Sequence, residues 1–176
     1  MSNHYLAKWK NEKELSGLSV KTKLSIIDQN SLTNRLMSKK NHGFSVNVLQ
    51  QECKFFNKSI RNNLPYNIKG FGVYRKVILS TNYYPEIQAY TFMLIKHISG
   101  KERFLKILGE RSLGTYILNT KRFKKKDTMY RKVHNMIHRI SKYSYHNKNI
   151  YLNEIFPDTI EFEKISYLNA RGKFVK

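Results

Sequence analysis

Hydrophobic and polar side chains alternate along several short segments of the chain. In residues 73–79, the side chains of Val73, Val77 and Leu79 fall on the same face. A period of two residues is typical of a β-strand that buries one of its faces. The other segments whose patterns predict strands are residues 44–48, 87–95, 128–133, 137–145 and 150–156.

Helical signals are shorter and depend on capping residues. Thr22 and Ser31 are candidate N-caps, because each precedes a segment with helical spacing of apolar residues. Ser99 followed by Glu102 matches a capping box, which predicts a further helix start. The predicted helices cover residues 22–27, 32–40, 100–108 and 112–118.

Most of the predicted connections are short, which favours antiparallel pairing of the strands. Residues 50–70 read as a connection with little regular structure, and the basic run at 121–126 reads as a solvated loop. These elements predict an α+β fold in one domain with an antiparallel sheet of about six strands. The domain is expected at residues 22–157, between an N-terminal extension at 1–21 and a tail of uncertain order at 158–176.

Composition is consistent with one folded domain. The chain has 176 residues, of which 40% are hydrophobic, enough for a hydrophobic core. Its single cysteine, Cys53, can form no internal disulfide, and no apolar run resembles a signal peptide. No segment approaches the roughly 20 apolar residues of a membrane-spanning helix. We therefore expect a cytoplasmic protein without a membrane span.

The formal net charge of +21 invites a nucleic-acid or acidic-lipid partner. Lys and Arg are nevertheless scattered along the whole chain, and the only dense run is residues 121–126. The chain is also rich in Lys, Asn, Ile and Tyr, a profile that A/T-rich coding produces without selection for a partner. We therefore expect compositional drift with a field that mildly favours anionic small molecules, rather than an obligatory nucleic-acid partner, and the charge alone does not decide the function.

Metal and nucleophile signatures are weak. His134 and His138 have a spacing that would place them on one side of a helix, but their segment has the pattern of a strand and a turn. We therefore expect surface histidines and no metal site. Cys53 has no recognisable catalytic signature, and no serine lies in a Gly-x-Ser-x-Gly elbow.

Two charged residues lie on apolar strand faces and are the strongest candidates for a site. Arg75 shares its face with Val73 and Val77, and Glu154 shares its face with Leu152. A buried charge costs several kcal/mol unless a partner receives it. The two residues either form an ion pair with each other or bind a ligand between them. An Arg fork matches a carboxylate and Glu can accept a hydrogen bond from a hydroxyl, so the ligand would be a hydroxy acid.

Five segments resemble the chorismate–pyruvate lyase family in order and spacing. Each is weak alone, and the resemblance covers about residues 24–157. The segments are residues 30–35 (NSLTNR), 44–48 (FSVNV), 74–79 (YRKVIL), 108–116 (LGERSLGTY) and 152–156 (LNEIF).

The resemblance implies a cofactor-independent and metal-free lyase. Enzymes of this family convert chorismate to 4-hydroxybenzoate and pyruvate, the entry step to the ubiquinone ring. The resemblance also implies a six-stranded antiparallel sheet with two helical flaps over a buried ligand pocket, and we expect a monomer. Arg75 matches the arginine that holds the ring carboxylate, and Glu154 matches the glutamate that faces the ring hydroxyl. Leu32 and Leu113 match flap positions that contact the ligand.

The chain departs from the family pattern at Tyr90, which stands where the family has a second basic residue. If that residue helps to hold the pyruvyl carboxylate, another cation must do so here. The resemblance also leaves open whether Glu154 accepts a proton or only orients the hydroxyl. Alternative functions are a non-catalytic, effector-sensor-like domain that binds an aromatic acid, and, less favoured, a basic RNA-binding protein.

Overall fold

Six antiparallel strands form the main sheet in the computed structural model, which describes residues 8–28, 31–37, 43–120, 122–163, 167–168 and 174–175. The strand order is β1-β2-β3-β6-β5-β4, so β1 and β4 form the two edges. The predicted α+β fold with a six-stranded antiparallel sheet is confirmed. The strands are β1 (Ser45–Phe56), β2 (Gly70–Ser80), β3 (Ile87–Leu94), β4 (Lys124–Val133), β5 (Met136–Tyr145) and β6 (Lys148–Pro157).

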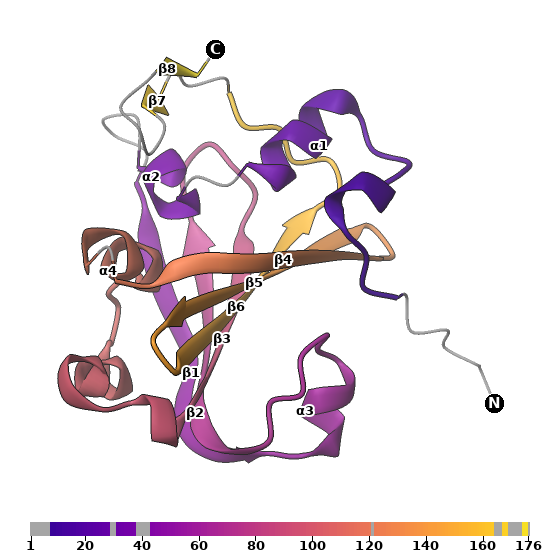
Figure 1. Cartoon of the computed structure of the whole chain (residues 1–176). Coiled ribbons are helices and arrows are strands. Elements are labelled where there is room, and N and C mark those ends of the chain that lie inside the picture. Colours follow the sequence, from indigo (N-terminus) through magenta and orange to yellow (C-terminus); the bar gives the residue numbers. More distant parts are fainter. Residues whose placement is uncertain are drawn as a thin grey trace.

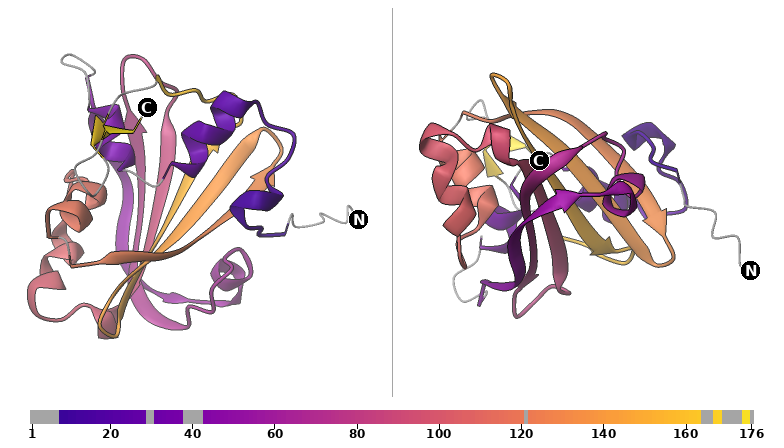
Figure 2. Two further views of the ribbon diagram at one scale, coloured as in Figure 1. Left: turned by 45° about the horizontal axis from the view of Figure 1, so that its top comes forward. Right: turned by 90° about the horizontal axis from the view of Figure 1, so that it is seen from below.

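Short helices surround the sheet, which twists strongly along its length (Figures 1 and 2). α3 lies at the opposite end of the molecule from α1 and α2 (Figure 1). A two-stranded ribbon of β7 (Tyr167–Leu168) and β8 (Phe174–Val175) follows the main sheet in the sequence. The helices are η1 (Glu12–Glu14), α1 (Val20–Ile27), α2 (Leu32–Leu36), α3 (Lys58–Asn62), η2 (Ile95–His97), η3 (Gly100–Ile107) and α4 (Leu113–Thr120).

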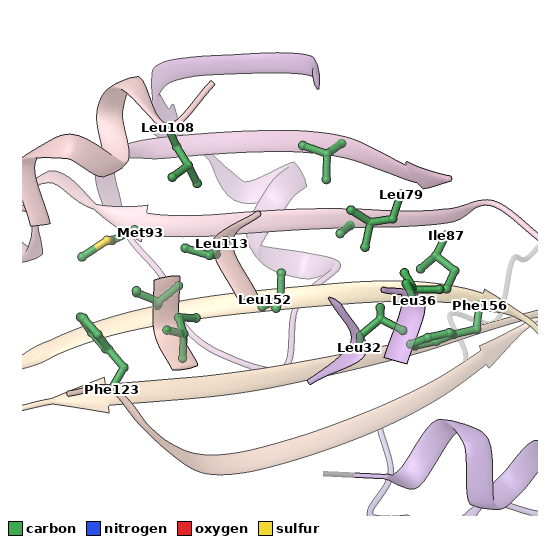
Figure 3. Packing of buried hydrophobic residues seen from close by; sticks show 14 of the residues in the cluster. Leu32, Leu36, Leu79, Ile87, Met93, Leu108, Leu113, Phe123, Leu152 and Phe156 are labelled. Atoms are coloured by element: carbon green, nitrogen blue, oxygen red, sulfur yellow. The ribbon is translucent and has the colours of Figure 1, made fainter. Parts of the chain in front are cut away.

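The two faces of the sheet bury separate hydrophobic clusters. The larger cluster lies on the face that carries Val73 and Val77, and the helices α1, α2 and α4 pack on it. Figure 3 shows residues of this cluster, among them Leu32 and Leu113 from the helices and Leu152 from the sheet. The smaller cluster, on the opposite face, is built mainly from aromatic residues and is covered by the segment around α3. We call the face with the larger cluster the inner face and the face with the smaller cluster the outer face.

Residues 50–70 are more regular than the sequence pattern predicts. β1 continues to Phe56 and pairs with β2 along its whole length, and α3 follows it. The register shifts between Val48 and Gln50, and a β-bulge of this kind interrupts the alternation of side chains. The prediction of an irregular connection was wrong because the bulge hides the strand pattern.

The sequence predicted a loop for the basic run at 121–126, but from Lys124 onward this run is part of a strand. Lys124 begins β4, which pairs with β5 from Lys124 to Val133. An edge strand tolerates lysines because only one side of its backbone is paired and exposed side chains stay in water. Here too the register shifts, between Lys125 and Asp127.

Two helix starts differ from the predicted ones. Ser19, rather than Thr22, caps α1, and its Oγ accepts from the Thr22 N–H at 3.0 Å. The Ser99 side chain makes no capping hydrogen bond, and the segment that follows is a 3₁₀-helix. Glu102 is instead buried, where its carboxylate contacts the Nζ of Lys148. The prediction of a capping box was wrong, because Glu102 forms an ion pair with Lys148 instead of bonding to the backbone at the helix start.

The chain ends that flank the predicted domain pack against it where the structure describes them. Lys10 and Tyr130 exchange two backbone hydrogen bonds of 2.8 Å, so the N-terminal segment extends the β4 edge. The Phe162 N–H donates to Ser25 Oγ of α1 at 2.9 Å. Among the described residues, no helix is long and apolar enough to cross a membrane.

Candidate active site

A cavity of about 260 Å³ lies between the inner face of the sheet and the helices α2 and α4. Its lining is largely apolar, with hydroxyl groups from both helix segments. All four residues that the sequence predicted for the site line this one cavity, namely Leu32, Arg75, Leu113 and Glu154. The charged residues among those that line it are Arg75, Lys125, Arg139 and Glu154.

Arg75 is buried, with 3% of its surface exposed, and hydrogen-bonds only to neutral oxygens in the described part of the chain. Its Nη1 donates to Gln51 Oε1 at 2.7 Å and to the Gly109 carbonyl at 2.6 Å. Its Nη2 donates to the Arg111 carbonyl at 3.1 Å. Burial lowers the pKa of Arg75 below the usual value, because the charged form loses its hydration.

The strand register and one glycine explain this geometry. Gln51 lies directly opposite Arg75 on β1. Gly109 follows η3 with a positive φ of 57°, a conformation that favours glycine and that turns the chain at the end of the helix. The carbonyls of Gly109 and Arg111 therefore reach Arg75 from the segment that leads into α4. Arg75 is therefore hydrogen-bonded both to the sheet and to the segment that leads into α4.

Glu154 meets a different cation, Arg139, rather than Arg75. Arg139 lies directly opposite Glu154 on β5, and its Nε and Nη2 both lie 2.8 Å from Glu154 Oε2. The Nη1 of Arg139 donates to the carbonyls of Ile26 at 2.7 Å and Asp28 at 3.0 Å. Burial has the largest single effect and would lower the pKa of Arg139, but Glu154, Tyr143 and Tyr130 together outweigh it and raise the pKa. The ion pair between Arg75 and Glu154, which the sequence left open, is absent from the described structure.

Arg139 was missed in the sequence, although a signal for it existed. It lies two residues after Ile137 in an alternating segment, so it shares a face with an apolar residue, as Arg75 does. Only the pairing of β5 with β6 reveals that its partner is Glu154. A carboxylate has two oxygens and several acceptor positions, so Glu154 retains capacity to accept a hydrogen bond from a ligand.

The helices α2 and α4 approach each other closely over the cavity. Thr33 Oγ1 and Ser112 Oγ share a hydrogen bond of 2.8 Å. A Cβ atom at Gly114 would lie 2.7 Å from Thr33 Oγ1, so this approach requires glycine. Leu32 and Leu113 are 6% exposed and lie beneath this contact, on the cavity. We call α2 and α4 the two flaps.

Tyr90 lies on the outer face, away from the cavity. Its hydroxyl donates to Gln88 Oε1 at 2.9 Å, and its ring lies 6.2 Å from that of Tyr74. Lys125, in contrast, lines the cavity, and its Nζ lies 5.6 Å from the centre of the Tyr143 ring. Sequence reasoning missed Lys125 because its segment was taken for a loop.

The two histidines differ in environment. His134 is exposed in the turn between β4 and β5, with a φ of 52°. His138 is half-buried on β5, with its ring 6.3 Å from that of Trp9, so it is not a surface residue as predicted. Burial, with the charge of Arg131, lowers the pKa of His138 to about 4.

Cys53 is exposed. Among the described residues, no three His, Cys, Asp or Glu side chains group as a metal site would require.

Three solved structures are similar in part to this chain. They are a GntR-family transcriptional regulator from Bacillus cereus (16% identity, TM-score 0.46, covering 70% of this chain and 98% of that one), a possible transcriptional regulator, YydK, from Bacillus subtilis (10%, 0.47, 75% and 67%), and the ligand-binding domain of a putative GntR-family regulator from Bordetella bronchiseptica (13%, 0.41, 74% and 93%). Among curated proteins, no sequence matches this chain.

Comparison with protein-family models gives a result for nearly the whole chain. The model described as chorismate lyase matches residues 4–166, a range that includes the complete main sheet and both flaps. The chain belongs to the chorismate lyase family.

Proposed function

We propose that this protein is a chorismate lyase that eliminates pyruvate from chorismate and leaves 4-hydroxybenzoate, a precursor of ubiquinone. The observation that supports this most directly is the cavity whose lining includes a buried guanidinium, that of Arg75, and a fixed carboxylate, that of Glu154. A para-hydroxy acid presents a carboxylate and a hydroxyl at opposite ends of its ring. The cavity provides one group suited to each.

Arg75 retains two N–H donors for the ring carboxylate in the described part of the chain. A guanidinium has five N–H donors, and Gln51, Gly109 and Arg111 accept three of them, including both on Nη1. Among the described residues, none accepts from Nε–H or from the second N–H of Nη2. Two parallel N–H donors of a guanidinium bind a carboxylate bidentately. The three neutral acceptors hold the guanidinium in place without neutralising its charge.

Glu154 faces the other end of the ring in this proposal. Its Oε2 is held by Arg139, which prevents the carboxylate from rotating toward Arg75. The carboxylate accepts the hydrogen bond of the ring hydroxyl and so orients the ring. Two variants of the reaction are compatible with this placement. In one, Glu154 also takes up the proton of the ring carbon, and in the other that proton passes directly to the leaving group.

The reaction needs positioning more than chemical assistance from the protein. The ether C–O bond breaks, the ring carbon that bears the hydroxyl loses its proton, and the ring becomes aromatic. The enolpyruvyl group takes up a proton at its methylene carbon and leaves as pyruvate. An enclosed cavity orients the substrate, excludes water and stabilises charge on the departing oxygen. The flaps, joined by the Thr33–Ser112 hydrogen bond, provide this enclosure.

The test is direct. Purified protein is mixed with chorismate, and 4-hydroxybenzoate and pyruvate are quantified over time by chromatography. Equimolar formation of both is expected, with a large loss of turnover in Glu154→Gln. Glu86→Gln, at an exposed position, is the matched control and should react like the parent protein. Binding of 4-hydroxybenzoate without any turnover would contradict the enzymatic proposal and favour a non-catalytic binding domain.

A further inference from the structure

We propose that Lys125 is the second carboxylate anchor of the cavity, so that the site selects dicarboxylates with one group on Arg75 and the other on Lys125. This inference rests on the proposed function, because the substrate named there has an enolpyruvyl carboxylate besides the ring carboxylate. Tyr90 lies on the outer face and is not among the residues that line the cavity.

A β-bulge places Lys125 on the cavity. Lys125 lies opposite Tyr143 on β5, and the register then shifts so that Asp127 lies opposite Lys142. Tyr143 lines the cavity, and Thr128 lies opposite Ser141 of the same strand face, so the inner-face alternation resumes after one extra residue. The bulge thus turns one lysine of the basic run inward. Its neighbours Lys124 and Lys126 are exposed.

The curl of the sheet brings Lys125 and Arg75 to the same cavity. Their strands, β4 and β2, are separated by three others in the sheet. In a flat sheet this separation would place them roughly 19 Å apart, at about 4.8 Å per strand. Both nevertheless line one cavity of about 260 Å³. The sheet is curved rather than flat (Figure 2), which brings its distant strands closer together. The two cations therefore line one cavity although they come from strands that are far apart in the sheet, and a dianion in the cavity could contact both.

The charges of the lining match a dianion. Three cations, Arg75, Lys125 and Arg139, and one carboxylate, Glu154, line the cavity, which gives the lining an excess of two positive charges. Two ligand carboxylates would balance that excess. Burial, followed by repulsion from Arg139, lowers the pKa of Lys125 to about 8, while Glu154 acts in the opposite direction. A ligand carboxylate beside Lys125 would replace the lost hydration.

The decisive experiment compares two ligands on the same variants. Lys125→Met keeps an unbranched side chain but removes the charge. We expect a KM for chorismate about ten- to hundredfold higher, the size expected from loss of a charge-assisted hydrogen bond. The Kd of 4-hydroxybenzoate, which has only the ring carboxylate, should stay within about twofold of the parent, a difference of less than about 0.5 kcal/mol. Lys125→Arg should restore most of the chorismate affinity.

Lys124→Met and Lys126→Met are matched controls, because they remove the same charge from exposed neighbours in the same strand. If all three variants raise KM equally, a diffuse field is responsible and the proposal is overturned. Equal weakening of chorismate and 4-hydroxybenzoate by Lys125→Met would assign a structural role instead. If the parent protein shows no turnover, the proposed function fails, and calorimetric binding of chorismate against 4-hydroxybenzoate still decides whether Lys125 distinguishes them.

Discussion

Two buried arginines on the inner face of the sheet, Arg75 and Arg139, meet very different partners. Arg139 pairs with a carboxylate and two backbone carbonyls, whereas Arg75 has only neutral acceptors in the described structure. Both are 3% exposed. Burial alone therefore does not distinguish the two arginines. The distinction lies in whether the fold itself supplies the compensating anion.

The two arginines also differ in the parts of the fold that they connect. The Arg139–Glu154 pair joins β5 to β6 and, through the Ile26 and Asp28 carbonyls, to the end of α1. Breaking such a pair leaves an uncompensated buried charge. Under the proposed function, the positive charge of Arg75 is instead compensated by the ligand carboxylate. Substitutions at the two arginines, at the flaps and at Lys125 test this contrast, with effects that decrease in that order.

Arg139→Met should destabilise the protein more than substitution of Arg75, Gly114 or Lys125. It leaves Glu154 buried without its cation, which costs about 3–5 kcal/mol of unfolding free energy. Urea unfolding followed by circular dichroism measures this loss. Adding Glu154→Gln to Arg139→Met should recover part of it, because the buried charge is then gone. A loss below about 1 kcal/mol would show that the pair is unimportant for folding.

Arg75→Met should weaken ligand binding more than it lowers stability, the opposite of what we expect for Arg139→Met. The binding free energy of 4-hydroxybenzoate should weaken by about 1.5–3 kcal/mol, a Kd roughly ten- to 150-fold higher, because a charge-assisted pair is lost. Stability should change less than in Arg139→Met, since only neutral oxygens lose a donor. Calorimetry and urea unfolding on the same preparations give both values. Equal effects of the two variants on stability and on binding would remove the contrast between the two arginines.

Gly114→Ala should loosen the two flaps. The added Cβ would lie 2.7 Å from Thr33 Oγ1, so the flaps must separate, with a cost of about 1–3 kcal/mol typical of overpacking. Faster dissociation of 4-hydroxybenzoate, measured by stopped-flow, is the expected result. The double variant Gly114→Ala, Thr33→Ala removes the obstructing hydroxyl and should restore slower dissociation in part. Additive effects of the two changes would contradict a direct contact between them.

The smallest effect concerns pH and tests the Lys125 side of the cavity. Because the pKa of Lys125 is lowered to about 8, its cation is present below that pH and is lost as the pH rises through it. The KM for chorismate should therefore be constant below about pH 8 and rise above it, by up to about tenfold per pH unit. Lys125→Arg should abolish this rise. The Kd of 4-hydroxybenzoate should remain level over the same range.

Sequence reasoning located Arg75 and Glu154 because a charge on an apolar strand face is visible in local alternation. The same criterion applies to Arg139, which it would have identified as a third buried charge. It failed for Lys125 and for residues 50–70, because a β-bulge interrupts the alternation in both places. It failed for Glu102, because the ion pair with Lys148 joins segments far apart in the chain.

The sequence by itself determined most of the strands, the face on which Arg75 and Glu154 lie, and the family. These properties depend on neighbouring residues and on the spacing of short motifs. Only the tertiary structure decided that Glu154 pairs with Arg139, that Lys125 reaches the cavity and that the flaps meet at Thr33 and Gly114. Such contacts depend on strand register, bulges and the curl of the sheet. Register, bulges and curl depend on residues far apart in the sequence, so a local pattern of side chains does not predict them.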